Sequence, residues 1–327
     1  MKDFKRFHNL LSILITILFL VLLSIFSLAA EYPAEKAIRI ISPTAAGGSN
    51  DIVSRLVTSS AQQIVGQRMD TIAMPGAGGQ EAVNFVINEP QDGYTLLITD
   101  YGCLVTPALQ EDLGYNLSDW KPIIQITEYI PTIFVREDSP IVDANDWIAQ
   151  AKADPGKFSI AHGTNLCPPH IGLIMVEKAT GIKNSWVPTS GGSEALSFVL
   201  GGHVDMGASI PTTIKSSVDA GLVRALGLTS EERSLFLPDT PTFKELGYDA
   251  VSTSWLMVFA YKDVPEDRIS FLEEKLIEAL NTDGALAMAK RLNIEFNLQG
   301  REKSQEIYDR ALEDLTDLFT ELDMLKK

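Results

Sequence analysis

The residues of this sequence best suited to chemistry form a short segment of small residues, from Pro43 to Asp51. The segment reads Pro-Thr-Ala-Ala-Gly-Gly-Ser-Asn-Asp and lies between an apolar run at 38–41 and an amphipathic stretch. Where a strand ends in small residues and a helix begins directly after them, the first backbone N–H groups of the helix have no intrahelical partners and lie at the end of the sheet. Together with the positive end of the helix dipole, these groups predict a binding place for an anion.

The same arrangement of small residues before a helical stretch recurs three times. The segments are 75–79 (Pro-Gly-Ala-Gly-Gly), 164–170, and 190–193 (Ser-Gly-Gly-Ser). Glycine also serves in any tight turn, so one such loop alone has an equally simple structural explanation. Four loops of this kind in one chain favour a cleft built for a carboxylate or phosphate group.

The sequence lacks the patterns of the common catalytic and metal sites. His162, His170 and His203 do not stand at metal-ligand spacing, and Cys-x-x-Cys does not occur. Residues 191–195 (Gly-Gly-Ser-Glu-Ala) nearly match the nucleophile elbow of hydrolases but end in alanine. No glycine segment completes a phosphate-loop or dinucleotide pattern. We therefore expect no enzyme, no cofactor and no metal, with a secreted hydrolase as a remote alternative.

Length, composition and the N-terminus fit an exported two-domain protein. The chain has 327 residues, of which 45% are hydrophobic and 21% charged, as is usual for globular α/β proteins. Three basic residues within 2–6 precede a charge-free run at 10–28, and the small residues Ser-Leu-Ala-Ala follow at 27–30. This pattern is typical of a secretory signal peptide over residues 1–30. The run is also long enough to span a bilayer, so an uncleaved N-terminal anchor is the alternative.

The charge balance limits the partners. The formal net charge is −16, and the leader is itself basic, so the remainder is more acidic still. Such a chain repels nucleic acid and anionic membrane surfaces, and we expect neither as a partner. If the cleft takes an anion, local backbone donors must hold it against the long-range field. The pairing of the two cysteines, Cys103 and Cys167, is left open.

Strand and helix signals alternate after the leader, which predicts an α/β protein with mainly parallel sheets. Strands are predicted at 38–41, 94–99, 158–161, 204–207, 223–228 and 255–261, with another inside 123–135. Helices are predicted at 52–65, 80–87, 143–152, 168–180, 193–200, 265–280 and 302–325.

Taken in order, these segments resemble the substrate-binding receptors of tripartite tricarboxylate transporters, also called Bug-type or TctC-like receptors. The resemblance covers nearly all of the chain after the leader, and the order and spacing of its motifs carry it. The motifs are 32–33 (Tyr-Pro), 43–51, 75–79, 90–97 (Pro-Gln-Asp-Gly-Tyr-Thr-Leu-Leu), 154–157 (Asp-Pro-Gly-Lys), 200–205 (Leu-Gly-Gly-His-Val-Asp), 238–242 (Pro-Asp-Thr-Pro-Thr) and 254–255 (Ser-Trp).

The resemblance implies a two-domain periplasmic-binding-protein fold of type II, the Venus flytrap, with two crossover strands. Domain 1 would comprise 31–136 and 253–327, and domain 2 would comprise 137–252. A monomer of this kind would enclose a small mono-, di- or tricarboxylate and deliver it to the membrane permease subunits of a tripartite tricarboxylate transporter. The alternative is a membrane-anchored extracytoplasmic sensor that presents the same ligand to a signalling partner.

The resemblance also implies one grip on the ligand from each domain. The first-domain residues would be Thr44, Ala45, Ala46, Gly47 and Gly48, with Gly76, Ala77, Gly78 and Gly79 lining the cleft. The second-domain residues would be Thr164, Asn165, Cys167 and His170, with Ser190, Gly191 and Asp205 nearby. Turn capping by Thr164 and Asn165, a structural hydrogen bond of His170, and solvation of Asp205 at a strand end are the structural alternatives.

The chain departs from the family pattern at several of these positions. Thr44 stands where an aromatic residue is usual, and Ala-Met at 73–74 replaces the usual asparagine and arginine. In the second-domain loop, Thr164, Leu166, Cys167 and Pro169 replace glycine and serine. These departures predict an intact first grip and a second half of the pocket that takes a different or bulkier ligand.

Overall fold

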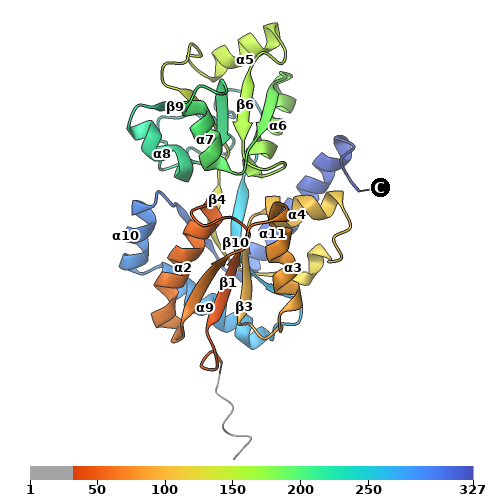
Figure 1. The fold of residues 1–327 in the computed structure, drawn as a ribbon, viewed down its shortest axis with the longest axis vertical. Helices are drawn as coiled ribbons and strands as arrows, with labels where there is room; N and C mark the ends of the chain where they lie inside the picture. The colour runs from red at the N-terminus through yellow and green to blue at the C-terminus, as the bar shows by residue number, and fades with distance from the viewer. Residues whose placement is uncertain (1–31, 327) are drawn as a thin grey trace, which may run out of the picture.

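The computed structural model describes residues 32–326 and folds them into two lobes, each built around one β-sheet (Figure 1). The predicted leader at 1–30 lies outside the described residues. Lobe 1 holds a six-stranded sheet in the order β11-β4-β10-β3-β1-β2, and lobe 2 holds a five-stranded sheet in the order β7-β6-β8-β5-β9. Between residues 32 and 326 we find no helix with both the length and the apolar character needed to cross a membrane.

Lobe 1 combines parallel and antiparallel pairing. Strand β1 pairs in parallel with β2 and β3, whereas β10 runs antiparallel to β3 and β4. Its strands are β1 (Ile38–Ser42), β2 (Met69–Ala73), β3 (Thr95–Thr99), β4 (Trp120–Tyr129), β10 (Ser254–Tyr261) and β11 (Phe296–Gln299). Its helices are α2 (Ser49–Val65), α3 (Gln80–Asn88), α4 (Tyr101–Gln110), α9 (Glu266–Leu280), α10 (Asp283–Arg291) and α11 (Arg301–Glu321), with short 3₁₀ turns at Ala77–Gly79 and Leu117–Asp119.

Lobe 2 repeats this arrangement on a smaller scale. Strand β6 pairs in parallel with β7 and β8, and β5 runs antiparallel to β8 and β9. Its strands are β5 (Thr132–Arg136), β6 (Ser159–His162), β7 (Ser185–Pro188), β8 (Met206–Ser209) and β9 (Val223–Leu228). Its helices are α5 (Ala144–Ala153), α6 (Pro168–Thr180), α7 (Gly192–Leu200) and α8 (Pro211–Asp219).

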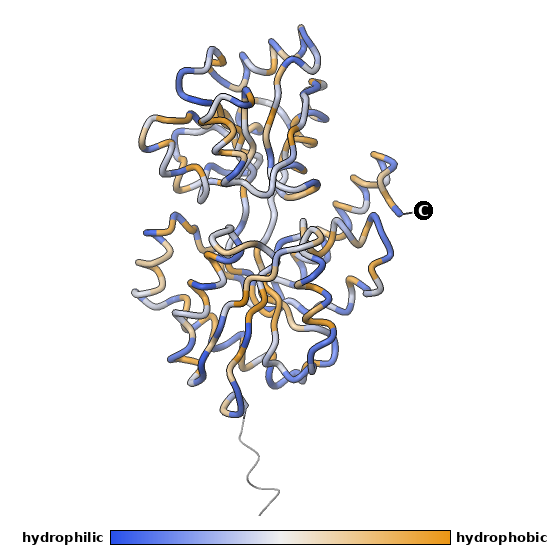
Figure 2. Tube along the Cα trace, in the orientation of Figure 1, coloured by the Kyte–Doolittle hydropathy of each residue, from blue (hydrophilic) through white to orange (hydrophobic). Residues whose placement is uncertain are grey.

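Both faces of each central strand are buried, because helices cover the two sides of each sheet. In β1, Ile38 and Ile40 pack into one hydrophobic core and Ile41 into the core on the opposite face. In β5, Ile133 and Phe134 divide in the same way between the two cores of lobe 2. Strands buried on both faces read as continuous apolar runs, which explains why the sequence predicted them well. Figure 2 shows hydrophobic segments concentrated along the strands inside lobe 1.

The chain crosses between the lobes twice. It leaves lobe 1 after β4, through Ile130 and Pro131, and it returns to β10 through 251–253. The segment 229–250 before this return still belongs to lobe 2, where Leu237, Phe243 and Ala250 are part of the hydrophobic cores. The sequence placed residues up to 136 in the first domain, but β5 pairs with β8 and β9 and so lies in lobe 2. The run 123–135 is apolar throughout because both sheets bury it, and composition does not mark the point of crossing. We therefore place the boundary between the domains at 130–131.

Most predicted elements occur within a few residues of their expected positions, but several were missed. They are β2, β7, β11, α4, α8 and α10, and the single strand predicted inside 123–135 is two strands, β4 and β5, one in each lobe. Strands β2, β7 and β11 lie at sheet edges and are only four or five residues long, so they lack a continuous apolar run. Helix α4 contains Gly102 and Pro107, which normally interrupt helices. Its position is nevertheless important, because it begins at the cleft between the lobes.

Candidate ligand-binding site

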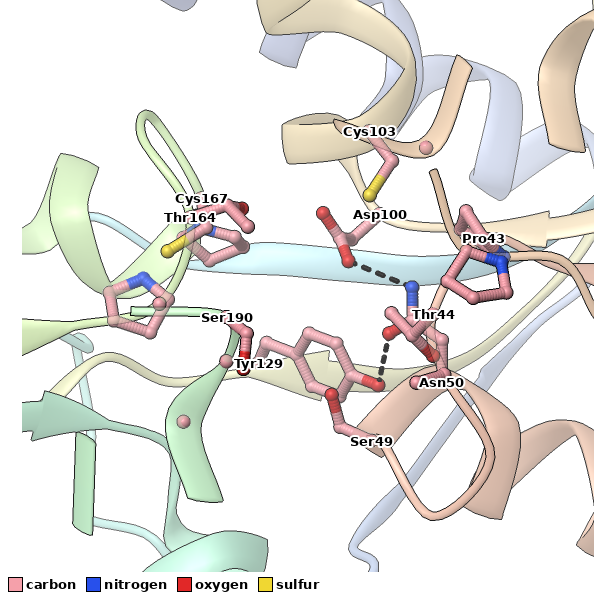
Figure 3. Close-up of a pocket in the computed structure, with 18 of the residues that line it drawn as sticks. Pro43, Thr44, Ser49, Asn50, Asp100, Cys103, Tyr129, Thr164, Cys167 and Ser190 are labelled. Carbon is pink, nitrogen blue, oxygen red and sulfur yellow. Dashed lines mark hydrogen bonds between the residues drawn. The ribbon is translucent and has the colours of Figure 1, made fainter. Parts of the chain in front are cut away.

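A cavity of about 340 Å³ lies between the two lobes, at the carboxyl ends of β1, β3, β6 and β8 (Figure 3). In open α/β sheets this edge is where ligands bind, because loops and helix N-termini converge on it. Lobe 1 contributes Pro43, Thr44, Ala45, Ser49, Asn50, Pro75, Gly76, Gly78, Gly79, Asp100, Cys103 and Tyr129. Lobe 2 contributes Gly163, Thr164, Cys167, Pro168, Pro169, Ser190, Gly191, Gly192, Ser209, Ile210 and Thr213.

On the lobe 1 side, the N-terminus of α2 reaches the cavity. Gly48 is the N-cap and supplies no side chain to the first turn, so the amides of Ser49 and Asn50 have no intrahelical partner. The amides just before them are already used. The Gly47 N–H donates to Asp51 Oδ2 (2.9 Å) and the Gly48 N–H donates to the Ala45 carbonyl (2.9 Å). The donors available on this side are therefore at 49–50, slightly later in the chain than predicted.

Three polar side chains form a connected network at the base of the cavity. Tyr129 Oη donates to Asn50 Oδ1 (2.9 Å), and Asn50 Nδ2 donates to Asp100 Oδ2 (3.0 Å). Asp100 is the N-cap of α4, and its Oδ1 accepts from the Gly102 N–H (2.7 Å). Burial raises the pKa of Asp100, and these hydrogen bonds oppose that rise. The network places one carboxyl group in the wall of the cavity.

On the lobe 2 side, the N-terminus of α7 meets the end of β8. Ser209 is 1% exposed, and its Oγ has no hydrogen-bond partner among residues 32–326. A Cβ on Gly192 would stand 2.4 Å from that Oγ, so only glycine lets the helix approach the hydroxyl this closely. A buried hydroxyl without a partner is costly, and here a ligand could supply the missing hydrogen bond. Ser209 and the first-turn amides of α7 therefore form the stronger donor group of lobe 2.

The N-terminus of α6 offers fewer donors than the sequence suggested. Its first two residues are Pro168 and Pro169, which have no N–H. The Leu166 N–H donates to His170 Nδ1 (2.9 Å), and the Cys167 N–H donates to the Thr164 carbonyl (3.2 Å). The loop 164–170 thus contributes shape to the cavity wall more than backbone hydrogen bonds.

Among residues 32–326, no lysine, arginine or histidine lines the cavity. Its titratable groups are Asp100, Tyr129 and the thiols of Cys103 and Cys167, which are both free. Burial raises the pKa of each thiol, so both remain protonated and do not act as nucleophiles at neutral pH. The wall therefore has hydrogen-bond donors and one carboxyl group, but no cationic side chain.

The structure brings together nine of the sixteen predicted site residues. The residues that line the cavity are Thr44, Ala45, Gly76, Gly78, Gly79, Thr164, Cys167, Ser190 and Gly191. The residues outside its lining are Ala46, Gly47, Gly48, Ala77, Asn165, His170 and Asp205. Gly47 and Gly48 shape the loop before α2 rather than the wall. At Ser190, both the N–H and the hydroxyl donate to Glu194 Oε2 (2.7 Å each), so neither is available in this structure.

His170 and Asp205 point to other parts of lobe 2. The His170 ring stacks on His162 at 4.0 Å between ring centres and contacts Trp186, and burial lowers its pKa to about 3. The Asp205 carboxylate accepts from the N–H (2.8 Å) and hydroxyl (2.6 Å) of Ser159, at the start of β6. Asp205 directly precedes β8, whose other end, at Ser209, lines the cavity. Asp205 therefore lies at the opposite end of the sheet from the cavity.

The prediction missed the residues that contribute the most distinctive groups. Asn50 is inside the first motif, but its side chain was not assigned a role. Asp100 directly follows the predicted strand 94–99, and Ser209 ends β8. A polar residue at the carboxyl end of a buried parallel strand is a usable signal for both. Tyr129 lies inside an apolar run, and no local pattern distinguishes it.

Two sheets of this strand order, joined by two crossings and with a cavity at their facing edges, define a periplasmic binding protein of type II. The family model for the tripartite tricarboxylate transporter family receptor matches residues 53–309. The chain therefore belongs to the tripartite tricarboxylate transporter receptor family, as the motifs predicted.

Relatives and solved structures agree with this assignment. The UPF0065 protein in the gbd 5′ region of Cupriavidus necator is 31% identical over 77% of this chain and 77% of its own length. Protein BugT of Bordetella pertussis is 30% identical over 78% of this chain and 79% of its own length. The structure of the periplasmic binding protein BugD aligns with a TM-score of 0.80 at 27% identity, covering 90% of this chain and all of BugD. The predicted fold class is thus confirmed.

Proposed function

We propose that this protein is an extracytoplasmic receptor that captures a small organic acid between its lobes and delivers it to a tripartite tricarboxylate-type permease. The observation that carries the proposal is the buried Ser209 hydroxyl, which lacks a partner within the described chain and faces a cavity between the lobes. The N-termini of α2 and α7 reach the same cavity with unused first-turn amides. No chemistry on the ligand is needed for this role.

Two structural relatives support the class of ligand. MatC from Rhodopseudomonas palustris, with bound malate, aligns with a TM-score of 0.76 at 23% identity over 88% of this chain and 99% of its own. R. palustris Rpa4515, with adipate, aligns with a TM-score of 0.82 at 22% identity over 91% of this chain and all of its own. A cavity of about 340 Å³ matches small molecules of that kind.

Hydrogen bonds alone can supply the affinity that such a receptor needs. A hydrogen bond to a charged group contributes about 1.5–3 kcal/mol. Three or four of them, less the cost of immobilising the ligand, correspond to a dissociation constant in the micromolar range. Hinge closure adds to this by removing water from around the ligand.

The lobes are already in contact beside the cavity, as a closing receptor requires. Thr212 Oγ1 of α8 donates to the Asn293 carbonyl (2.9 Å). Thr106 Oγ1 of α4, which donates to the Gly102 carbonyl (3.1 Å), lies 3.5 Å from the Leu166 carbonyl across the cleft. The export signal predicted at 1–30 would place the receptor outside the cytoplasm, where a permease can accept its ligand.

A thermal-shift screen of the purified protein against small carboxylic acids tests the proposal, followed by calorimetry on the acids that raise the melting temperature. Ser209→Ala should weaken binding of those acids by about tenfold, since it removes a charge-assisted hydrogen bond. Ser197→Ala is the matched control, because Ser197 lies on the exposed side of α7. A screen in which no acid binds, or equal affinities for both variants, would contradict the assigned site.

A further inference from the structure

We propose that the ligand carries an ammonium group as well as a carboxylate, and that Asp100 receives the ammonium group. The captured molecule would then be an amino acid or a related amino-carboxylate. The inference rests on the proposed function and narrows its ligand class.

The position of Asp100 is the first observation. Its side chain lies in the wall of the cavity and is largely buried, at 6% exposure for the residue. Figure 3 shows the carboxyl group projecting into the space between the lobes, with Asn50 and Pro43 on one side and Thr164 and Cys167 on the other. A group in this position contacts whatever occupies the cavity.

The hydrogen bonds of Asp100 show what kind of group it can accept. Oδ1 accepts from the Gly102 N–H and Oδ2 accepts from Asn50 Nδ2. The Tyr129 hydroxyl donates to the Asn50 oxygen, which turns the amide nitrogen of Asn50 toward Asp100. Burial raises the pKa of Asp100, and its two N–H donors oppose that rise by favouring the ionised carboxylate, which accepts about four hydrogen bonds in total. At least one lone-pair direction on each oxygen therefore remains for a ligand donor.

The surroundings of Asp100 lack a cation. The titratable groups near it are Tyr101, Cys103, Tyr129 and Cys167, none of which carries positive charge. Within the described part of the chain, no basic side chain lines the cavity on either side. An ionised carboxylate buried without a cation is costly, and a second anion beside it adds repulsion. A ligand ammonium group at Asp100 removes both costs, while the ligand carboxylate uses the donors of lobe 2.

The capping role of Asp100 does not account for its charge. Asp100 is the N-cap of α4, and asparagine serves that role about equally well. The variant Asp100→Asn therefore keeps the cap and removes the charge. It also places an amide nitrogen opposite Asn50 Nδ2, which donates to Asp100 Oδ2, so the melting temperature of the variant is measured before its affinities. Asp143 is the N-cap of α5 on the outside of lobe 2, where its side chain accepts from the Asp146 N–H (2.8 Å), and Asp143→Asn is the matched control.

Calorimetry at neutral pH with the full protein tests the inference. The probes are aspartate, glutamate and alanine, each paired with the acid that lacks the amino group: succinate, glutarate and propionate. The amino acid of at least one pair should bind more tightly than its partner by roughly tenfold or more, because a buried acceptor left without a donor is penalised strongly. Asp100→Asn should reverse that preference, and Asp143→Asn should leave it unchanged.

The outcomes separate the inference from the proposed function. If the plain acids bind as well as or better than the amino acids, the inference fails and the proposed function stands. Should Asp100→Asn keep the wild-type preference, Asp100 is not the group that receives the ammonium, and the inference also fails. If no acid of either set binds, the proposed function fails and the inference fails with it.

Discussion

Replacing Gly102 with alanine is expected to weaken ligand binding by preventing full closure of the lobes. Gly102 is the second residue of α4 in lobe 1. An added Cβ would stand 3.0 Å from Cys167 Cα and 3.1 Å from Pro168 Cδ, both in lobe 2. These distances are shorter than ordinary contacts, so the lobes would have to separate by a few tenths of an ångström at this point.

The size of the effect follows from this contact. Overpacking of this kind costs about 1–3 kcal/mol. Only the closed state bears the contacts with Cys167 and Pro168, so affinity should fall by about 5- to 150-fold. The melting temperature of the ligand-free protein should not fall, because alanine is more favourable than glycine in a helix by up to about 1 kcal/mol. Calorimetry with the best acid from the screen measures the affinity.

Gly284→Ala is the matched control for this experiment. Gly284 is the second residue of α10, and a Cβ there would meet no atom within 4 Å. The Gly102 methyl would also stand 2.9 Å from Asp100 Oδ1, so a crystal structure of the ligand-saturated variant is a necessary second readout. It distinguishes a displaced Asp100 with unchanged lobe positions from lobes that have moved apart. Unchanged affinity together with an unchanged spacing of the lobes would refute the reasoning.

Two further predictions concern stability. Gly192→Ala should lower the free energy of unfolding by about 1–3 kcal/mol, because its Cβ would stand 2.4 Å from Ser209 Oγ. In urea denaturation, the double variant with Ser209→Ala should regain most of that loss. If the double variant instead loses the sum of the two single-variant losses, the contact is contradicted. Burial lowers the folded-state pKa of His170 to about 3, so the unfolded chain binds more protons below the ordinary histidine pKa and stability should fall as the pH drops from 7 to 4. In urea titrations, His170→Gln should reduce the dependence of the unfolding free energy on pH, whereas His203→Gln, at an exposed residue, should leave it unchanged. If His170→Gln shows the same pH dependence as the unsubstituted protein, His170 is not the group responsible.

The sequence predicted the elements with strong local signals. Helix α2 combines an apolar face with Gly66 at its end, which adopts a left-handed conformation at φ 75° and stops the helix. Strand β10 is apolar from Trp255 to its end at Tyr261, because both of its faces are buried. In contrast, α4 contains a glycine and a proline, and its stability comes from tertiary packing that no local pattern reports.

The candidate site was only partly predictable for a related physical reason. Of the residues that the motifs predicted for the site, 44–45, 76, 78–79 and 190–191 do lie around one cavity at the sheet edges. The motifs could not show which backbone amides the loops use internally, and Gly47 and Gly48 proved to be occupied in this way. Asp100 and Ser209 come from different lobes, and only the fold brings them to one cavity. The spacing of these two residues along the chain does not indicate that they line the same cavity.

The central claim is that backbone amides and hydroxyls, rather than cationic side chains, hold the carboxylate of the ligand. A crystal structure of the protein with its tightest-binding acid tests this claim most directly. We predict that the carboxylate lies in the cavity between the lobes, within hydrogen-bonding distance of Ser209 Oγ and the first-turn amides of α7. A carboxylate bound to a lysine or arginine side chain, or located outside the cleft, would contradict the account.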